Sequence, residues 1–232
     1  MFRNTWNKMQ EIYGNEGQLE LLTAENYLFT KELTLILQKF SRGKILDAGA
    51  GYLSRKKLLN KFSEKYISCD VERFHPDIDY VCDLTGEMPF KEKEFDTIVN
   101  ISVLEHTKKP ILVLKNFHKV LADNGYIVLA TPFLFYEHGM PYDYFRFTTN
   151  GIKELAEEAD LNIVEFIKTG GLICSFLSLF ASVFSLTLFM VHLKFLIPYL
   201  TKFIAFVCSF EPDFMKRSFY GMTISVLNKK NS

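Results

Sequence analysis

The 232-residue sequence predicts an α/β fold in which a mostly parallel sheet carries helices on both faces. Three observations support this prediction: short apolar segments alternate with helical ones, acidic residues follow several of the apolar segments, and glycines follow the first. An alternation of strands and helices is typical of a parallel sheet, and such sheets bind ligands at the carboxyl ends of their strands. The length suits one domain with an additional segment and is sufficient for a substantial core.

The predicted elements follow in order along the chain. Residues 1–43 are predicted to form an N-terminal helical leader, because leucines, with Ile36 and Phe40, supply an irregular apolar face between residues 19 and 40. Apolar runs then predict strands at 44–48, 66–70, 79–82, 95–101, 125–131, 161–168 and 220–227. The clearest helices between them are 110–121 and 149–159. The sheet domain is therefore assigned to 44–168 and 219–232, and an apolar helical insertion to 169–218.

Acidic residues stand at the ends of the first three predicted strands. Asp47 lies in the run Lys-Ile-Leu-Asp-Ala-Gly-Ala-Gly, Asp70 ends the second strand, and Asp83 follows the third. Glycine has no Cβ and accepts positive φ, so Gly49 and Gly51 let the backbone approach a ligand closely. An acid about 20 residues after such a loop can accept both hydroxyls of a ribose. The sequence therefore predicts a nucleoside pocket at this edge of the sheet.

These motifs resemble those of the class I S-adenosylmethionine-dependent methyltransferases. In that family the first strand ends in Asp-x-Gly-x-Gly, an acid after the second strand holds the ribose, and an Asp with an apolar neighbour after the third meets the adenine. The fourth strand there often runs into a Leu-Glu-His-like turn, matched here at 104–106. A Leu-x-x-x-Gly turn leads to the fifth strand, matched at 121–125. One departure is visible, because the third glycine of many members is Leu53 here.

The resemblance implies a Rossmann-like seven-stranded sheet, mostly parallel with an antiparallel last strand, and S-adenosyl-L-methionine as the cofactor. It assigns the cofactor contacts to Asp47, Gly49, Ala50, Gly51, Asp70, Val71, Asp83, Leu84 and Asn100. Simpler interpretations exist, because an isolated Gly-x-Gly is weak and a strand-end aspartate often caps a helix or forms a turn. A nicotinamide-dinucleotide fold is the nearest competitor. Against it, Ser54 replaces the last glycine of that fingerprint, and Asp47 has no role there.

The amino-acid composition indicates which cellular compartment and which classes of binding partner suit this protein. Lysine plus arginine equals aspartate plus glutamate, 27 against 27, so a nucleic-acid substrate is disfavoured. The four cysteines show no metal-ligand spacing and are interpreted as free thiols in a reducing compartment, and no metal site is predicted. The first residues contain no apolar signal-peptide core, which favours a cytoplasmic location.

Charged side chains are absent from 169–193, and 172–191 is long enough to span a bilayer as a helix. A single crossing would place the last strand on the wrong side. Either 172–191 and 195–210 form a helical hairpin that enters a membrane and returns, or both lie along a surface of the domain or the bilayer. A buried cap and a homodimer contact remain alternatives. Helical spacing places two sets of residues on different faces of the first segment: Ser175, Ser178, Ser182 and Ser185 on one, Phe176, Phe180 and Phe184 on another.

A polar, aromatic loop after the fifth predicted strand carries most of the candidate catalytic groups. His138 in this loop and His106 after the fourth strand are candidates for a general base, with Asp143 orienting the imidazole. The run His-Gly-x-Pro-x-Asp-Tyr-x-Arg-Phe-Thr resembles a segment of methyltransferases encoded among glycan-assembly enzymes. The predicted acceptor contacts are Tyr142, Tyr144 and Arg146. Alternatively, Arg146 pairs with Asp143 to order the loop, and Glu105 is a structural acid.

The sequence thus predicts in-line transfer of a methyl group from S-adenosylmethionine to an oxygen of a saccharide or lipid-linked acceptor. The enzyme is expected on the cytoplasmic side, with a possible peripheral contact between residues 172–210 and a membrane surface. A small apolar acceptor such as a quinone precursor, with the insertion as its lid, is an alternative. A third alternative, from another functional class, is a catalytically silent module that binds a membrane or a protein partner. Such a module would have lost the cofactor carboxylates, and all three are present.

Overall fold

A computed structural model describes residues 5, 8–9, 12–13 and 19–230. The chain divides into two compact units. As far as they are described, the first comprises Met1–Thr34 with Lys168–Met222, and the second comprises Leu35–Ile167 with Thr223–Ser232. The second unit is close to the sheet domain predicted at 44–168 and 219–232. The predicted leader up to Thr34 and the predicted insertion belong to the first unit, whereas residues 35–43 of the leader belong to the second. The sequence does not reveal this division, because the leader and the insertion lie far apart in it.

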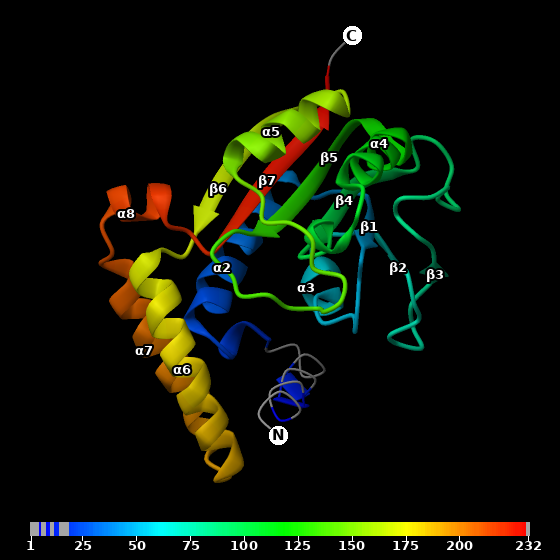
Figure 1. Cartoon of the computed structure of the whole chain (residues 1–232). Coiled ribbons are helices and arrows are strands. Elements are labelled where there is room, and N and C mark those ends of the chain that lie inside the picture. Colours follow the sequence, from blue (N-terminus) through cyan, green and yellow to red (C-terminus); the bar gives the residue numbers. More distant parts are fainter. Residues whose placement is uncertain (1–4, 6–7, 10–11, 14–18, 231–232) are drawn as a thin grey trace. The chain divides into compact units, whose positions relative to one another are not determined.

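The sheet has seven strands in the order β3-β2-β1-β4-β5-β7-β6 (Figure 1). Their bounds are β1 Lys44–Ala48, β2 Lys65–Asp70, β3 Tyr80–Val81, β4 Phe95–Ile101, β5 Leu121–Pro132, β6 Leu161–Thr169 and β7 Met222–Lys229. The strands β3, β2, β1, β4 and β5 run parallel. The last strand is antiparallel, because Gly221 N donates to Thr169 O at one end of β6 and Lys230 N donates to Asp160 O at the other. The predicted strands and the predicted sheet are therefore confirmed, with β5 starting four residues early.

Helices cover both faces of this sheet. The second unit contains α3 Lys56–Leu59, the 3₁₀ turn η2 Leu104–His106, α4 Pro110–Val120 and α5 Thr149–Glu158. Phe117 of α4 and Ile152 of α5 are fully buried in one core with Ile127 of β5. The neighbouring Tyr126 points to the other face, where its ring contacts Phe40 at the end of α2 (Ala24–Phe40). The helix α5 begins as predicted, because Thr148 Oγ1 accepts a hydrogen bond from Gly151 N.

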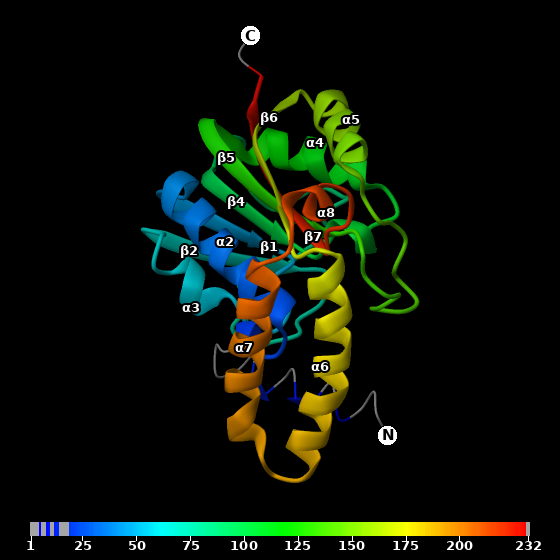
Figure 2. The ribbon, with the colours of Figure 1, turned by 90° about the vertical axis from the view of Figure 1, so that its left-hand side faces the viewer.

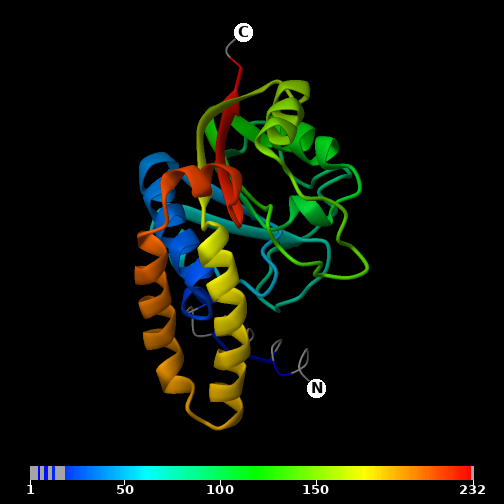
Figure 3. The same ribbon diagram turned by 60° about the vertical axis from the view of Figure 1, so that its left-hand side comes forward.

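The first unit is built around a helical hairpin. It contains η1 Leu19–Leu21, the start of α2, α6 Leu172–Met190, η3 Lys194–Leu196, α7 Ile197–Ser209 and α8 Asp213–Ser218. Figures 2 and 3 show α6 and α7 side by side. The buried Glu211 caps α6, because its carboxylate accepts hydrogen bonds from Ile173 N at 2.9 Å and Cys174 N at 3.3 Å. A carboxylate at this end satisfies free N–H groups and interacts favourably with the helix dipole.

The two predicted faces of α6 are confirmed. Ser178 and Ser185 are buried, whereas Phe176, Phe180 and Phe184 are 58%, 71% and 55% exposed. Among the described residues, α6 is the helix long and apolar enough to cross a membrane, and 33% of its most apolar stretch is buried. A core helix would be mostly buried, so α6 leaves an apolar face uncovered. The hairpin agrees with the first predicted arrangement, while its contact with a membrane and a homodimer contact remain predictions.

The four cysteines are free, as predicted, and Cys69, Cys174 and Cys208 are buried.

Candidate active site

The loop after β1 brings the backbone to the carboxyl edge of the sheet. Gly49 has φ +87°, and a Cβ there would lie 2.3 Å from Val103 Cγ2, so only glycine fits. Gly51 has φ +53°, and a Cβ there would meet no atom within 4 Å. Gly49 is therefore required by the packing of the loop, whereas Gly51 borders open space that a ligand can use.

Leu53 occupies the position where the resembling family often has a third glycine. Its φ of +58° lies in the left-handed region that glycine adopts easily. This conformation costs a leucine about 1–2 kcal/mol. The Leu53 side chain is buried beside Ala50 and Ile78, which offsets this cost. At the position of the family's third glycine, this chain therefore holds a leucine in a conformation that glycine adopts more easily.

Two strand-end carboxylates face this loop from adjacent strands. Asp70 Oδ2 accepts a hydrogen bond from Gly51 N and Oδ1 accepts one from Val71 N, both at 2.7 Å. Asp47 Oδ2 accepts a hydrogen bond from the Tyr66 hydroxyl at 2.7 Å. Burial raises the pKa of Asp47 to about 6, against the lowering effect of the Tyr66 hydrogen bond, and the charge of Asp70 adds to the rise. Burial also raises the pKa of Asp70, while the N–H groups of Gly51 and Val71 oppose the rise.

The other predicted cofactor residues lie around the same strand ends. Asp83 follows β3, is exposed, and closes a turn by accepting hydrogen bonds from Thr85 N and Oγ1 at 2.8 Å. Leu84 beside it is buried, and Val71 is 59% exposed. Asn100 on β4 donates from Nδ2 to Ala48 O at 2.8 Å. The sheet thus brings the strands that carry Asp47, Asp70 and Asp83 into neighbouring positions, β1, β2 and β3.

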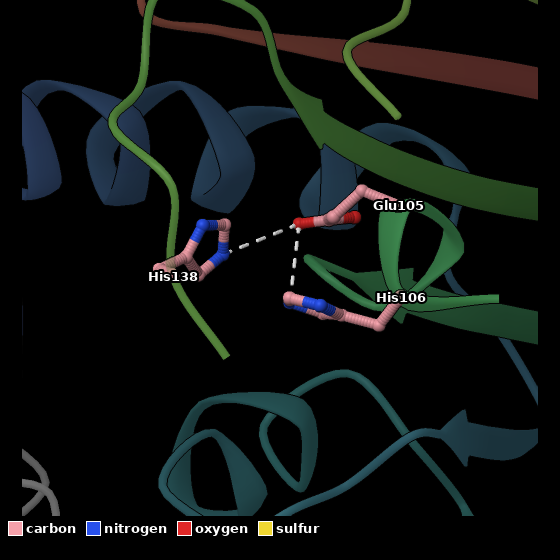
Figure 4. Close-up of side chains that lie close together, drawn as sticks. All are labelled: Glu105, His106 and His138. Atoms are coloured by element: carbon pink, nitrogen blue, oxygen red, sulfur yellow. Dashed lines mark ion pairs between the residues drawn. The ribbon is translucent and has the colours of Figure 1, made fainter. Parts of the chain in front are cut away.

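A second group of side chains comes from the ends of β4 and β5. Figure 4 shows Glu105 and His106 of η2 facing His138 of the loop after β5. Nε2 of His106 and Nε2 of His138 each lie 3.9 Å from the same atom, Glu105 Oε1. The two imidazole rings meet edge to face with centroids 4.7 Å apart. We call Glu105, His106 and His138 the triad.

Hydrogen bonds on the outer side of each imidazole orient the triad. His106 Nδ1 lies 2.7 Å from Tyr142 O, and because a carbonyl oxygen only accepts, Nδ1 carries the proton. His138 Nδ1 lies 3.3 Å from Tyr136 O and 3.4 Å from Asp143 Oδ2. Arg146 Nη2 lies 3.5 Å from the same nitrogen but donates its two N–H groups to Tyr136 O and Asp143 Oδ2 at shorter distances, so the two acceptors favour a proton on Nδ1 there as well. Each neutral histidine thereby presents an unprotonated Nε2 toward Glu105.

Burial dominates the electrostatics of the triad. The Glu105 side chain is fully buried, and burial raises its pKa to about 8. Burial, together with the charge of His106, lowers the pKa of His138. The Arg146 hydrogen bonds hold the pKa of Asp143 well below its usual range. Asp143 is therefore the fixed negative charge of the loop, in keeping with its predicted role of orienting an imidazole.

A family match covers more than half of the chain. Residues 22–165 match the family described as methyltransferase domain. The chain belongs to the class I S-adenosylmethionine-dependent methyltransferases. The match decides between the predicted family and the dinucleotide fold, and it confirms the predicted cofactor, S-adenosyl-L-methionine.

Known proteins similar to this methyltransferase differ in what they do. An uncharacterized protein of Methanocaldococcus jannaschii is 27% identical over 135 residues, which are 56% of this chain and 58% of that protein. The chain therefore spans little more than half of that relative. The [4+2]-cyclase SpnF is 14% identical with a TM-score of 0.58, covering 87% of this chain and 81% of SpnF. The 1,6-didemethyltoxoflavin-N1-methyltransferase of Burkholderia thailandensis, solved with S-adenosylhomocysteine, is 13% identical with a TM-score of 0.53, covering 99% and 86%. These two structures share the fold.

Of the three predicted acceptor contacts in this methyltransferase, Arg146 is hydrogen-bonded within its own loop, whereas Tyr142 and Tyr144 are exposed. Arg146 donates to Asp143 Oδ1 at 2.6 Å and Oδ2 at 2.8 Å. It also donates to three carbonyl oxygens, those of Phe135, Tyr136 and Phe145. These contacts use the five N–H groups of the guanidinium and support the loop-ordering alternative. Binding of an acceptor anion by Arg146 remains a prediction that these contacts do not support. Tyr142 and Tyr144 are 62% and 36% exposed.

Two residues that matter for the site were not singled out for it in the sequence. The sequence suggests only a structural role for Glu105, although an acid directly before a candidate catalytic histidine is a signal of its own. Gly139 has φ +65°, and a Cβ there would lie 2.7 Å from His106 Cε1. The glycine of the His-Gly-x-Pro run therefore makes room for the His106 ring.

Proposed function

We propose that this methyltransferase transfers the methyl group of S-adenosylmethionine to a hydroxyl oxygen of a saccharide or lipid-linked acceptor. The acceptor oxygen attacks the methyl carbon in line, the new C–O bond forms as the S–CH₃ bond breaks, and S-adenosylhomocysteine leaves. Positioning donor and acceptor supplies much of the rate. The hydroxyl proton must also be removed, which calls for a basic group beside the transferring carbon.

The observation that carries the proposal is the triad at the ends of β4 and β5. β4 is hydrogen-bonded to β1, whose end carries Asp47 and the glycine loop. The triad therefore belongs to the same sheet edge as the residues expected to hold the cofactor. His138 Nε2 is the candidate proton acceptor, because its Nδ1 is oriented by Asp143 and Tyr136.

The loop that carries His138 has the side chains of a carbohydrate site. Tyr136, Tyr142 and Tyr144 are exposed on it, and their rings offer flat apolar faces with a polar hydroxyl. Such side chains suit the apolar face and the hydroxyl rim of a sugar ring. This aromatic composition supports a saccharide over an acceptor without a ring.

An acceptor screen with methyl-labelled S-adenosylmethionine tests the proposal. Saccharides, lipid-linked saccharides and quinone precursors are incubated separately with the full chain, after analysis of any co-purified ligand. We expect label in an alkali-stable methyl ether of a saccharide, and none in the reaction without enzyme. Label found only in a quinone precursor, or in a nitrogen-linked methyl group, would contradict the proposed acceptor.

The apolar face of α6 supports the lipid-linked version of the acceptor. A bilayer contact through Phe176, Phe180 and Phe184 would hold the enzyme where such an acceptor resides. We expect the full chain to float with liposomes, and replacement of all three phenylalanines by serine to weaken the binding by at least about tenfold, because apolar area is lost. The double variant Leu35→Ser/Leu112→Ser, which also removes exposed apolar residues, is the control. Equal flotation of both variants would exclude this face as the membrane contact.

Asp47 gives the proposed cofactor binding a defined pH dependence. If the ionised carboxylate pairs with the ammonium group of the cofactor, a pKa of about 6 leaves about a tenth of it ionised at pH 5. We therefore expect the affinity for S-adenosylhomocysteine, measured by calorimetry, to fall about tenfold between pH 7.5 and pH 5. In Asp47→Asn the affinity should be weak and nearly independent of pH. The same pH dependence in wild type and variant would remove Asp47 from cofactor binding.

The free energy of unfolding of the ligand-free protein should fall as the pH rises, whereas the affinity for the cofactor should rise with pH. The folded-state pKa of Asp47 lies above its unfolded value of 3.8, so its stabilising contribution is complete below about pH 4 and is lost as the pH rises through about 6. Ionised Asp47 then lowers the free energy of unfolding by on the order of 2–3 kcal/mol. Asp47→Asn should thus raise the melting temperature at pH 7.5 and leave it nearly unchanged at pH 4.

A further inference from the structure

The triad has the composition and spacing of a metal site. Nε2 of each histidine lies 3.9 Å from the same oxygen, Glu105 Oε1. The three ligand atoms all lie within 4.8 Å of one another. Two ligands of a tetrahedral ion with bonds of about 2.0–2.1 Å are about 3.4 Å apart, so side-chain movements of about 1 Å would close the triad on an ion.

Glu105 points to a ligand independently of the histidines. Its side chain is fully buried, and neither carboxylate oxygen accepts a hydrogen bond from any other residue that the structure describes. A buried carboxylate without partners is costly to the fold. A cation at bonding distance from Oε1 would satisfy this group, and the two imidazole nitrogens already face the same atom (Figure 4).

The surroundings of both histidines match those of metal-bound imidazoles. Such imidazoles donate their second N–H to a carbonyl or a carboxylate, which fixes the tautomer and the ring orientation. Tyr142 O is the acceptor beside Nδ1 of His106, and Tyr136 O and Asp143 Oδ2 are the acceptors beside Nδ1 of His138. The loop network of Asp143 and Arg146 thus orients a ligand of the triad without contacting the ion position itself.

We propose that Glu105, His106 and His138 bind a divalent transition-metal cation such as Zn²⁺, and that its open coordination position takes the acceptor hydroxyl. Two imidazoles and one carboxylate suit this class of ion, whereas Mg²⁺ and Ca²⁺ prefer oxygen ligands. The histidine side chains are 24% and 25% exposed, so the group is open to water or an acceptor on one side.

The second half of this proposal rests on the proposed function. Coordination to the cation polarises the O–H bond, the proton passes to solvent, and the oxygen pair attacks the methyl carbon as the S–CH₃ bond breaks. No oxidant or reductant is involved. With the metal bound, His138 acts as a ligand, and the cation makes the acceptor oxygen nucleophilic.

Titration of the metal-free full chain with Co²⁺ tests the site, because Co²⁺ bound by nitrogen and oxygen ligands absorbs visible light. We expect one Co²⁺ per chain, displaced by Zn²⁺. Glu105→Gln and His106→Ala should each bind at least about 100-fold more weakly. His118→Ala, which removes a histidine on α4 outside the triad, should bind as wild type does. The thermal shift caused by S-adenosylhomocysteine verifies that each variant is folded.

Unsaturable Co²⁺ binding by wild type, or equal binding by wild type and Glu105→Gln, would overturn the metal site. Methyl transfer that persists at full rate in chelator-treated protein would overturn the role of the metal and leave the proposed function intact. Absence of methyl transfer by protein that binds Co²⁺ and S-adenosylhomocysteine normally would instead count against the proposed acceptor, which separates the two proposals.

Discussion

Asp70→Ala is expected to abolish the rise in melting temperature that S-adenosylhomocysteine causes in the wild-type protein. Asp70 ends β2 beside the glycine loop, and its carboxylate is the one expected to accept the two ribose hydroxyls. Each hydrogen bond to a charged group contributes about 1.5–3 kcal/mol, so losing both weakens binding by about 100-fold or more. Differential scanning fluorimetry over a series of S-adenosylhomocysteine concentrations measures the effect.

The design must separate ligand contact from loop structure, because Asp70 also accepts hydrogen bonds from Gly51 N and Val71 N. Asp70→Asn keeps one acceptor oxygen for the loop and should retain more of the ligand-free stability than Asp70→Ala. Asp77→Ala removes an exposed carboxylate from the segment between β2 and β3 and should behave as wild type. Equal ligand-induced shifts in wild type and Asp70→Ala would exclude Asp70 from the cofactor site.

His138→Ala is expected to lower turnover by about 10²–10⁴-fold while the affinity for S-adenosylhomocysteine stays within about twofold of wild type. His138 faces Glu105 and His106 at the ends of β4 and β5, whereas the strand-end acids expected to hold the cofactor follow β1, β2 and β3. The substitution removes the group that acts on the acceptor hydroxyl, either as proton acceptor or as metal ligand. Initial rates with the acceptor found in the screen, together with calorimetry of S-adenosylhomocysteine, measure both quantities.

His118→Ala is the matched control, because it removes a partly buried histidine of α4 that does not belong to the triad. Wild-type turnover in His138→Ala would remove this residue from the chemistry. A parallel loss of turnover and cofactor affinity would indicate that the loop after β5 has collapsed, and would contradict the specific role assigned to His138. The Co²⁺ titration described above then distinguishes a proton acceptor from a metal ligand.

Much of the cofactor side could be predicted from local sequence. The strand-end acids and the Gly-x-Gly loop are separated by short elements whose periodicity identifies them, and a parallel sheet places successive carboxyl ends on one edge. Even Leu53, which breaks the family pattern, takes a left-handed conformation of the kind that glycine adopts easily. Gly49 packs so closely against Val103 that a larger residue would not fit at this position. This packing fixes the backbone of the loop.

The acceptor side was less predictable, because its contacts are long-range. Glu105 and His138 are 33 residues apart in the sequence, and no spacing rule joins them. Arg146 illustrates the same limit: sequence composition favoured an anion site, and the structure directs its donors at Asp143 and three carbonyl oxygens. A side chain with five donors binds whatever acceptors the folded loop presents, and that set is determined only when the loop closes.

The resemblance of the strand-end motifs to a known family predicted the seven-stranded sheet, the family and its cofactor. Short-range periodicity in the sequence predicted the individual strands and helices. It also determined the two faces of α6 through helical spacing. The folded structure was needed to show that the leader up to Thr34 shares one unit with the insertion, that no other described residue forms a hydrogen bond with the buried Glu105 carboxylate, and that two imidazoles converge on one of its oxygens. These features depend on how segments that are distant in the sequence pack together. Burial and long-range side-chain contacts are therefore defined only in the folded chain.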